Sequence, residues 1–234
     1  MTSAKAGPPS SKRRSAKVRQ AQNTDSRARN GSRRDLIVRA AVELFAANAY
    51  EDVSVDAVCE RAGVAHGLVS YHFKGKRGLL TAAVEWVWND MAKFQLWDPE
   101  DTTPDDRVRG SMQRHFAYIE EHRDWFLLTV GAVRAFPENE ELIRRSQMAG
   151  VRWTCEVLGL NISDDPYLRA ALMGWVGFTH EITMEWLSTG ELSTDVLAEL
   201  CIDALFTAIS APTRVQAKNR HDVRLTDAIA RLAP

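Results

Sequence analysis

The sequence is poor in cysteine: its 234 residues include three, Cys59, Cys155 and Cys201. They are far apart, odd in number and without Cys-x-x-Cys spacing, which argues against a disulfide framework and against a zinc site. No uninterrupted apolar run approaches the roughly 18–20 residues of a membrane span. The first residues also lack the apolar segment of a secretory signal. These absences predict a cytoplasmic protein with no membrane partner.

Familiar catalytic motifs are missing as well. We find no Gly-x-Ser-x-Gly, no Walker loop and no glycine-rich phosphate loop. His180 and Glu181 begin HEITM, which lacks the second histidine of the zinc motif HExxH. We therefore expect no enzyme activity, no metal and no cofactor. The open alternative is an enzyme built on a helical bundle, whose chemistry would depend on lone residues: His115, His122, Glu181 and Glu185.

Charge is unevenly distributed along the chain, although the net charge is −1. Residues 1–80 hold 15 Lys and Arg against 7 Asp and Glu, whereas residues 81–234 hold 15 against 24. A basic front joined to an acidic remainder favours contact between the front and a polyanion such as nucleic acid. A solubilising basic tail is the alternative, because 10 of those 15 cations precede residue 35.

The pattern of apolar residues predicts an all-α chain. Residues 1–32 have almost nothing to bury and are predicted to form a disordered basic arm. Residues 33–80 are predicted to form a three-helix DNA-binding head, 81–211 a helical bundle, and 212–234 a polar tail with a possible helix at 221–232. Glycine, proline and capping residues separate the segments. Helices are expected near 33–48, 54–62, 65–73, 76–96, 104–121, 124–136, 138–159, 166–189 and 194–210.

Two short helices within the head carry the clearest functional pattern. Ser54 is expected to cap the first, Gly63 to end it, and Asn48 to end the preceding helix in a left-handed conformation. On a helical wheel of the second, AHGLVSYHF at 65–73, Val69 and Phe73 share the buried side. The opposite side is small, hydroxylated, aromatic and basic. A helix of this kind fits the major groove of DNA, so the pair predicts a helix-turn-helix.

The segment VSVDAVCERAGVAHGLVSYHFKGKRGLL at 53–80 resembles the DNA-binding signature of the TetR family of transcriptional regulators. The resemblance extends over about residues 33–80, and it departs from the family pattern at Ala65, where Ser or Thr is usual. It implies a set of DNA-contacting residues: Ser54, Ala65, His66, Gly67, Leu68, Ser70, Tyr71, His72 and Lys76. Arg33 and Arg34 are further candidates, because they are the cations of the basic arm nearest to the folded part. We therefore expect a ligand-responsive regulator, most simply a repressor of a palindromic operator on double-stranded DNA. A non-specific DNA-binding protein is a further alternative.

The segment 81–210 is rich in aromatic residues and holds all seven tryptophans. The resemblance implies a pocket for a small apolar effector between its helices, and bundles commonly provide such pockets. Candidate lining residues are Phe116, Phe126, Trp153, Met173 and Phe178, with His115, Arg134 and His180 as possible polar anchors. The resemblance also implies a homodimer through the apolar helices 166–189 and 194–210, which could instead pack on their own chain.

Overall fold

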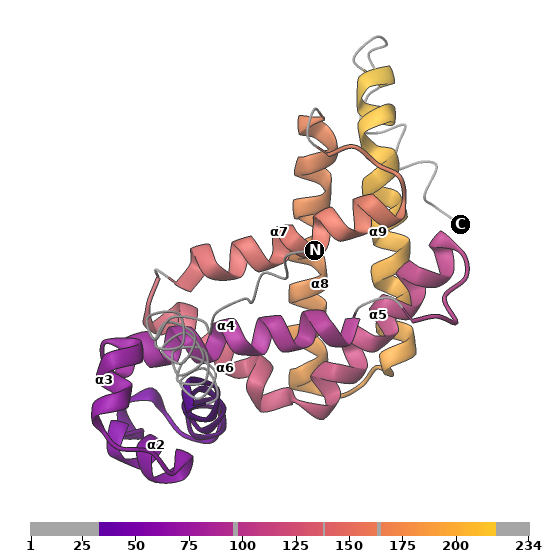
Figure 1. Cartoon of the computed structure of the whole chain (residues 1–234). Coiled ribbons are helices and arrows are strands. Elements are labelled where there is room, and N and C mark those ends of the chain that lie inside the picture. The colour runs from indigo at the N-terminus through magenta and orange to yellow at the C-terminus, as the bar shows by residue number, and fades with distance from the viewer. Residues whose placement is uncertain (1–32, 96–97, 138, 163–164, 219–234) are drawn as a thin grey trace, which may run out of the picture. The chain divides into compact units, whose positions relative to one another are not determined.

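The computed structural model describes residues 33–95, 98–137, 139–162 and 165–218. The basic arm at 1–32 and the helix considered at 221–232 lie outside these residues. The chain divides into two compact units, residues 1–84 and 85–234. All regular structure in the described residues is helical, which confirms the all-α prediction (Figure 1).

Short helices build the N-terminal unit. A first helix at 33–47 is followed by a 3₁₀ turn, η1 (Tyr50–Asp52), then by α2 (Val55–Ala62) and α3 (Gly67–Phe73). The next helix, α4 (Lys76–Gln95), begins in this unit and ends in the other. Each helix contributes apolar side chains to one core: Ile37, Val38, Ala41, Phe45, Val58, Val69, Phe73, Leu79 and Leu80.

The turns around α2 and α3 follow from local chemistry. The Ser54 hydroxyl accepts a hydrogen bond from the Ala57 amide at 3.0 Å and so caps α2. Gly63 ends α2 with φ 65°, a left-handed conformation that costs glycine little. α3 ends at Lys74, which is left-handed with φ 58°, and Gly75 follows with φ 114°.

The prediction for Asn48 is wrong. Its side-chain Nδ2 donates to the Leu44 carbonyl at 2.9 Å, satisfying an acceptor at the end of the first helix. Among the described residues, the non-glycine residue with positive φ is Lys74 instead. An asparagine can satisfy a helix end through its side chain without adopting left-handed backbone geometry, so its presence did not decide the conformation.

The C-terminal unit is a bundle of the end of α4 and five further helices. These are α5 (Pro104–Glu121), α6 (Arg123–Ala135), α7 (Asn139–Val157), α8 (Pro166–Thr189) and α9 (Thr194–Lys218). α5 begins with a capping box in which Thr103 and Asp106 exchange hydrogen bonds, and α8 begins at an Asp165 cap. α8 packs most extensively along α9, which also packs on α5 (Figure 1).

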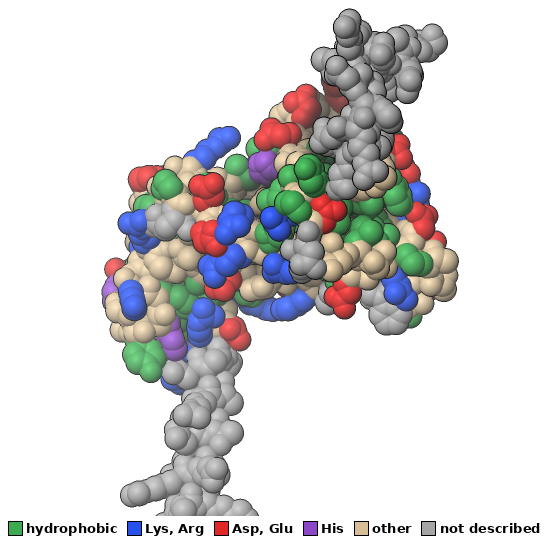
Figure 2. Space-filling model, turned by 90° about the horizontal axis from the view of Figure 1, so that it is seen from above, with side chains coloured by type: hydrophobic (Ala, Val, Ile, Leu, Met, Phe, Trp, Pro, Cys, Tyr) green, Lys and Arg blue, Asp and Glu red, His purple; other side chains and the backbone are tan. Residues whose placement is uncertain are grey.

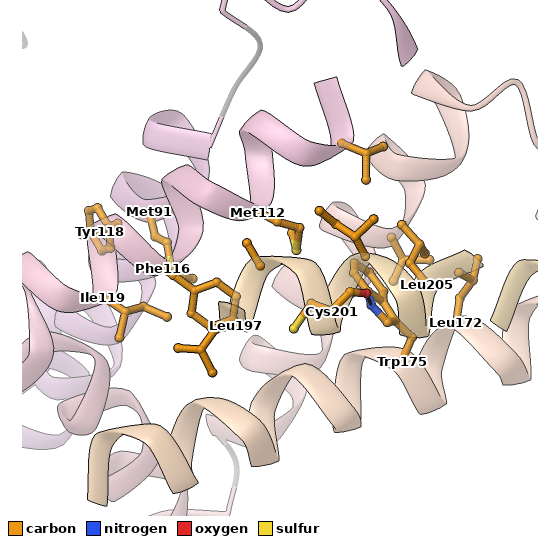
Figure 3. Packing of buried hydrophobic residues seen from close by; sticks show 14 of the residues in the cluster. Met91, Met112, Phe116, Tyr118, Ile119, Leu172, Trp175, Leu197, Cys201 and Leu205 are labelled. Carbon is orange, nitrogen blue, oxygen red and sulfur yellow. Dashed lines mark hydrogen bonds between the residues drawn. The ribbon is translucent and has the colours of Figure 1, made fainter. Parts of the chain in front are cut away.

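The core of the bundle lies where α5, α8 and α9 meet. Phe116 and Tyr118 of α5 are fully buried, as are Leu197 and Leu205 of α9 (Figure 3). The Trp175 indole Nε1 donates to the Cys201 carbonyl at 2.8 Å, so the buried polar atom of this large side chain is satisfied.

The last helix is longer than the sequence predicted. α9 continues through Pro212 to Lys218, whereas we expected the bundle to end at residue 211 and a polar tail to follow. Proline in a helix removes one amide donor and crowds the carbonyl four residues earlier. Pro212 is itself buried, and this packing offsets part of that cost.

α9 has a high mean hydropathy although it contains no long uninterrupted apolar run. Thr194–Thr213 is long and apolar enough, by length and composition, to cross a membrane, with mean hydropathy 1.5. Only 33% of this stretch is buried within the chain, and Glu199 and Asp203 interrupt it. Its apolar surface therefore exceeds what its own bundle covers.

Candidate nucleic-acid interface and ligand cavity

α3 presents the polar side that its sequence predicted. Val69 and Phe73 are buried beneath it. Tyr71 is 73% exposed, the largest exposed fraction among the large apolar side chains described. Ser70 and Gly67 are exposed on the same helix. The helix thus combines a firmly packed underside with an outer side that carries two hydroxyl groups and a glycine.

Gly67 makes this outer side unusually open. A Cβ atom built at Gly67 would meet no heavy atom within 4 Å, and the residue does not need positive φ. Neither packing nor backbone strain within the described unit therefore requires glycine here. Glycine at this position is explained if another molecule approaches the backbone of α3 closely, and the described part of the isolated unit contains no such contact.

The start of α3 is tied to α2 by one polar contact. His66 Nδ1 lies 2.5 Å from Asp56 Oδ1, and both side chains are largely exposed. His66 provides no side-chain cap for α3, and Ala65 before it has no side-chain group that could cap. The contact fixes the His66 ring beside the exposed face of α3 and places a carboxylate next to it.

The cationic side chains around α3 differ in their solvent exposure and in the contacts that they already make. Arg33 and Arg34 are exposed, and the Arg34 guanidinium lies 5.3 Å from the centre of the Phe73 ring. Lys76 is half-buried: its Nζ donates to the Glu51 carbonyl at 3.1 Å and lies 4.3 Å from the Tyr50 ring centre. Lys76 therefore braces the turn before α2 as well as offering a charge.

The remaining predicted residues are partly enclosed. Leu68 is half-buried, and so is His72, whose Nε2 has no hydrogen-bond partner among the described residues. Ser54 is exposed, but its hydroxyl already caps α2. Lys74 is exposed in the left-handed turn after α3, and it was not among the predicted contacts. In the sequence, Lys74 looks like any solvated lysine. Its left-handed position at the end of α3 is visible only in the folded structure.

The C-terminal unit contains a cavity of about 510 Å³ that is partly open to solvent. Helices α4 to α8 provide its wall, which combines three tryptophans with small hydroxylated and amide side chains. The lining residues are Glu85, Trp88, Asn89, Met91, Ala92, Gln95, Ser111, Met112, His115, Phe126, Leu142, Arg145, Ser146, Gln147, Ala149, Gly150, Val151, Trp153, Thr154, Trp175, Val176, Thr179, His180 and Thr183. A volume of this size suits a drug-sized molecule.

The cavity includes some of the predicted lining residues and leaves others outside. Phe126 and Trp153 lie in its wall, together with the proposed anchors His115 and His180. Phe116 packs in the core, Phe178 is 42% exposed on α8, and neither lines the cavity. Met173 and Arg134 are not among the lining residues either. Trp88 and Trp175 also line the cavity. Sequence spacing could not distinguish them from the tryptophans that lie elsewhere.

His115 is the most perturbed ionisable group of the cavity wall. Burial lowers the pKa of its imidazole from 6.5 to about 4, so the ring is neutral at physiological pH. Its Nδ1 is hydrogen-bonded to Gln95 Nε2. Arg145, by contrast, is 67% exposed and lies 3.8 Å from Glu141. The enclosed part of the wall thus offers neutral polar groups rather than a buried charge.

The residues of the alternative enzyme hypothesis do not converge. His115 lines the cavity, whereas His122 stacks on Trp125 with ring centres 4.2 Å apart. Glu181 and Glu185 are exposed on α8 and do not line the cavity. Within the described residues, no group of three or more His, Cys, Asp or Glu side chains could hold a metal ion.

Apolar side chains also reach the outer surface of the bundle (Figure 2). On α9 they are Val196, Leu200 and Phe206, and on α8 they include Phe178. At about 100° per residue, the three α9 side chains fall within an arc of about 120°. Glu199, in the same arc, forms an ion pair with Arg109 of α5.

Comparison with known proteins supports the assignment of the N-terminal unit. The sequence model for bacterial regulatory proteins of the tetR family matches residues 37–83. The HTH-type transcriptional regulator BetI of Pectobacterium atrosepticum is 29% identical over 87 residues, which cover 36% of this chain and 45% of that protein. The chain thus matches about half the length of this curated relative.

Solved structures resemble most of the fold. A tetR-family transcriptional regulator from Streptomyces coelicolor is similar with a TM-score of 0.64, at 22% identity, over 86% of this chain and 96% of that one. The multidrug binding protein EbrR, complexed with imidazole, is similar with a TM-score of 0.56, at 19% identity, over 74% and 89%. These likenesses establish the fold alone. Residues 37–83 thus match the tetR family of bacterial regulatory proteins, and the fold of the described chain resembles that of a solved tetR-family regulator.

Proposed function

We propose that this chain is a homodimeric transcriptional repressor of the cytoplasm, which binds a palindromic operator and is released from it by a small, largely apolar effector. The observation that carries the proposal is the exposed side of α3. This side exposes Tyr71, Ser70 and Gly67, while the opposite side of the helix is buried in the core. A helix presented in this way can enter the major groove, where hydroxyl groups read base edges or phosphates.

The uncovered apolar surface of α8 and α9 supports a two-fold dimer. Val196, Leu200 and Phe206 expose apolar area on a helix of which only a third is buried within the chain. A second copy would cover the same arc on both subunits at once, as closed two-fold symmetry requires. Two α3 helices would then meet half-sites one helical turn, about 34–36 Å, or a multiple of it apart.

Effector control would act through α4. This single helix places Leu79 and Leu80 in the core of the N-terminal unit, and it places Trp88 and Gln95 in the cavity wall. An effector that prefers an arrangement of α4 unsuited to DNA would lower operator affinity by the ratio of its affinities for the two arrangements. The ligand that EbrR holds in its structure is a property of that protein and gives only a precedent for a small molecule.

Selection from random duplex DNA with the full-length protein tests the proposal. We expect enrichment of an inverted repeat, bound roughly a thousand-fold or more tightly than random DNA at physiological salt. A non-specific DNA-binding protein would show binding without enrichment, and a helical-bundle enzyme would show neither. Either of those results would refute the repressor assignment.

A further inference from the structure

We infer that the cavity binds an uncharged, aromatic or otherwise apolar molecule carrying one hydrogen-bond acceptor, such as a ketone, and that this acceptor pairs with Nε2 of His115. The inference rests on the proposed function, because it names the chemical class of the effector for the same cavity. It goes further in assigning one polar contact and in excluding charged head groups.

The first step is the state of the His115 ring. The structure describes one hydrogen bond of this side chain, between Gln95 Nε2 and Nδ1. With the Gln95 amide oriented as in the structure, its nitrogen donates to Nδ1, and the single proton of the neutral ring is assigned to Nε2. The ring lines the cavity, and Nε2–H is its remaining donor. A molecule that fills the cavity must therefore supply an acceptor or leave this donor unpaired, which is costly when water is displaced.

The second step is the absence of a suitable partner for a charged ligand. The ionisable residues that line the cavity are Glu85 of α4, His115 of α5, Arg145 of α7 and His180 of α8. Glu85 is exposed. Arg145 is largely exposed and already paired with Glu141, with its Nε also donating to the Glu141 carbonyl at 3.4 Å. A formal charge carried into the enclosed part would lose its hydration without a buried counter-ion.

The third step is the shape and polarity of the wall. Trp88, Trp153 and Trp175 supply broad flat surfaces, whereas hydroxyl groups come from residues such as Thr179 and Thr183. Both threonine hydroxyls already donate to backbone carbonyls of α8, Thr179 to Trp175 at 3.0 Å and Thr183 to Thr179 at 2.6 Å. Having used their protons within the helix, they no longer compete with His115 as donors to a ligand.

A matched series of four probes tests the inference by equilibrium dialysis with the full-length protein at neutral pH. The probes share one bicyclic body and differ in the head group: 2-acetylnaphthalene, 2-ethylnaphthalene, 2-naphthoate and 2-(aminomethyl)naphthalene. We expect the ketone to bind roughly ten-fold more tightly than the hydrocarbon, which corresponds to one well-formed hydrogen bond. The carboxylate and the amine should bind more weakly than both.

Variants locate the contact. His115→Phe keeps a flat ring without a donor and should abolish the advantage of the ketone over the hydrocarbon. His115→Gln, which restores an amide donor, should recover part of that advantage. Arg134→Gln is the control, because Arg134 is exposed on α6 and does not line the cavity.

Several results would overturn the inference. These are a ketone that binds no more tightly than the hydrocarbon, an advantage that survives His115→Phe, tighter binding of the carboxylate with loss in Arg145→Gln, or failure of all four probes to bind. Since dialysis is done without DNA, the test is separate from the proposed function. A ketone that binds through His115 but does not release operator DNA would sustain this inference and refute the proposed effector control.

Discussion

Tyr118 of α5 is fully buried and donates its hydroxyl to Asp90 Oδ2 of α4 at 3.2 Å. Burial, and secondarily the Asp90 carboxylate, raises the pKa of Tyr118 well above its usual value, so the hydroxyl remains a donor. The Phe94 and His122 rings pack against the Tyr118 ring at centre distances of 5.6 and 4.6 Å. This contact fixes the part of α4 that also lines the cavity.

Tyr118→Phe is expected to lower the free energy of unfolding by about 1–2 kcal/mol, because a half-buried carboxylate loses its hydrogen-bond donor. Urea denaturation at fixed protein concentration measures the loss. Tyr71→Phe is the control, since the exposed Tyr71 hydroxyl should not affect stability. Equal stability of both variants would mean that the Tyr118–Asp90 contact does not hold α4 in solution.

Tyr71→Ala is expected to weaken operator binding by about 1–3 kcal/mol without changing stability, since Tyr71 is 73% exposed and its removal leaves no cavity. Gel-shift titration on the selected operator measures the effect. The matched control is Tyr167→Ala on α8, also an exposed tyrosine but outside the head. Equal losses in both variants would exclude the outer side of α3 as the DNA-reading surface.

Gly67→Ala separates folding from recognition. The added methyl group meets nothing within 4 Å, and alanine is a better helix former by up to about 1 kcal/mol, so stability should be equal or slightly higher. Operator affinity should nevertheless fall roughly ten-fold, because the methyl group keeps α3 away from the groove. Gly131→Ala on α6 has equally open surroundings and should bind DNA like the parent. Unchanged affinity in Gly67→Ala would contradict close approach at this position.

Local signals in the sequence predicted most helix boundaries. Thr103 before Pro104, Gly190 after α8 and Ser54 before α2 determine helix ends through hydrogen bonds or backbone geometry within a few residues. The end of α9 was predicted too early because burial of Pro212 is a tertiary effect.

The cavity was harder to predict than the helices. Phe116 and Phe126 are both aromatic residues on amphipathic helices, yet one is in the core and the other in the cavity wall. That difference depends on how the helices of the bundle are placed, which periodicity does not encode. The pairing of His115 with Gln95, 20 positions apart, likewise needed the packing of α4 on α5.

Leu200→Glu is expected to convert the proposed dimer to monomers in light scattering coupled to size-exclusion chromatography. Leu200 is 41% exposed in the apolar arc of α9, and two-fold symmetry would introduce the charge in both subunits at once. Leu36→Glu is the control, because Leu36 is comparably exposed but lies on the first helix. If the Leu200 variant stays dimeric while binding operator normally, the interface must lie elsewhere.

The half-buried His115 predicts a pH dependence of stability. Its folded-state pKa of about 4 lies below the unfolded value of 6.5, so the unfolded chain binds the extra proton first as the pH falls. The stabilisation associated with the neutral ring is complete above pH 6.5 and is lost progressively toward pH 4. At 1.36 kcal/mol per unit, the loss is at most roughly 3 kcal/mol, and water in the cavity reduces it.

Comparison with His115→Gln isolates this contribution, because the groups that titrate in both proteins cancel. The stability advantage of the parent over the variant should shrink by up to roughly 3 kcal/mol between pH 7 and pH 4, measured by urea denaturation at each pH. A conservative change elsewhere, Arg134→Gln, should give a profile parallel to that of the parent. If the His115→Gln profile is also parallel, the imidazole titrates normally. The cavity wall would then carry a positive charge under mildly acidic conditions, and its preference for uncharged molecules would not extend below neutral pH.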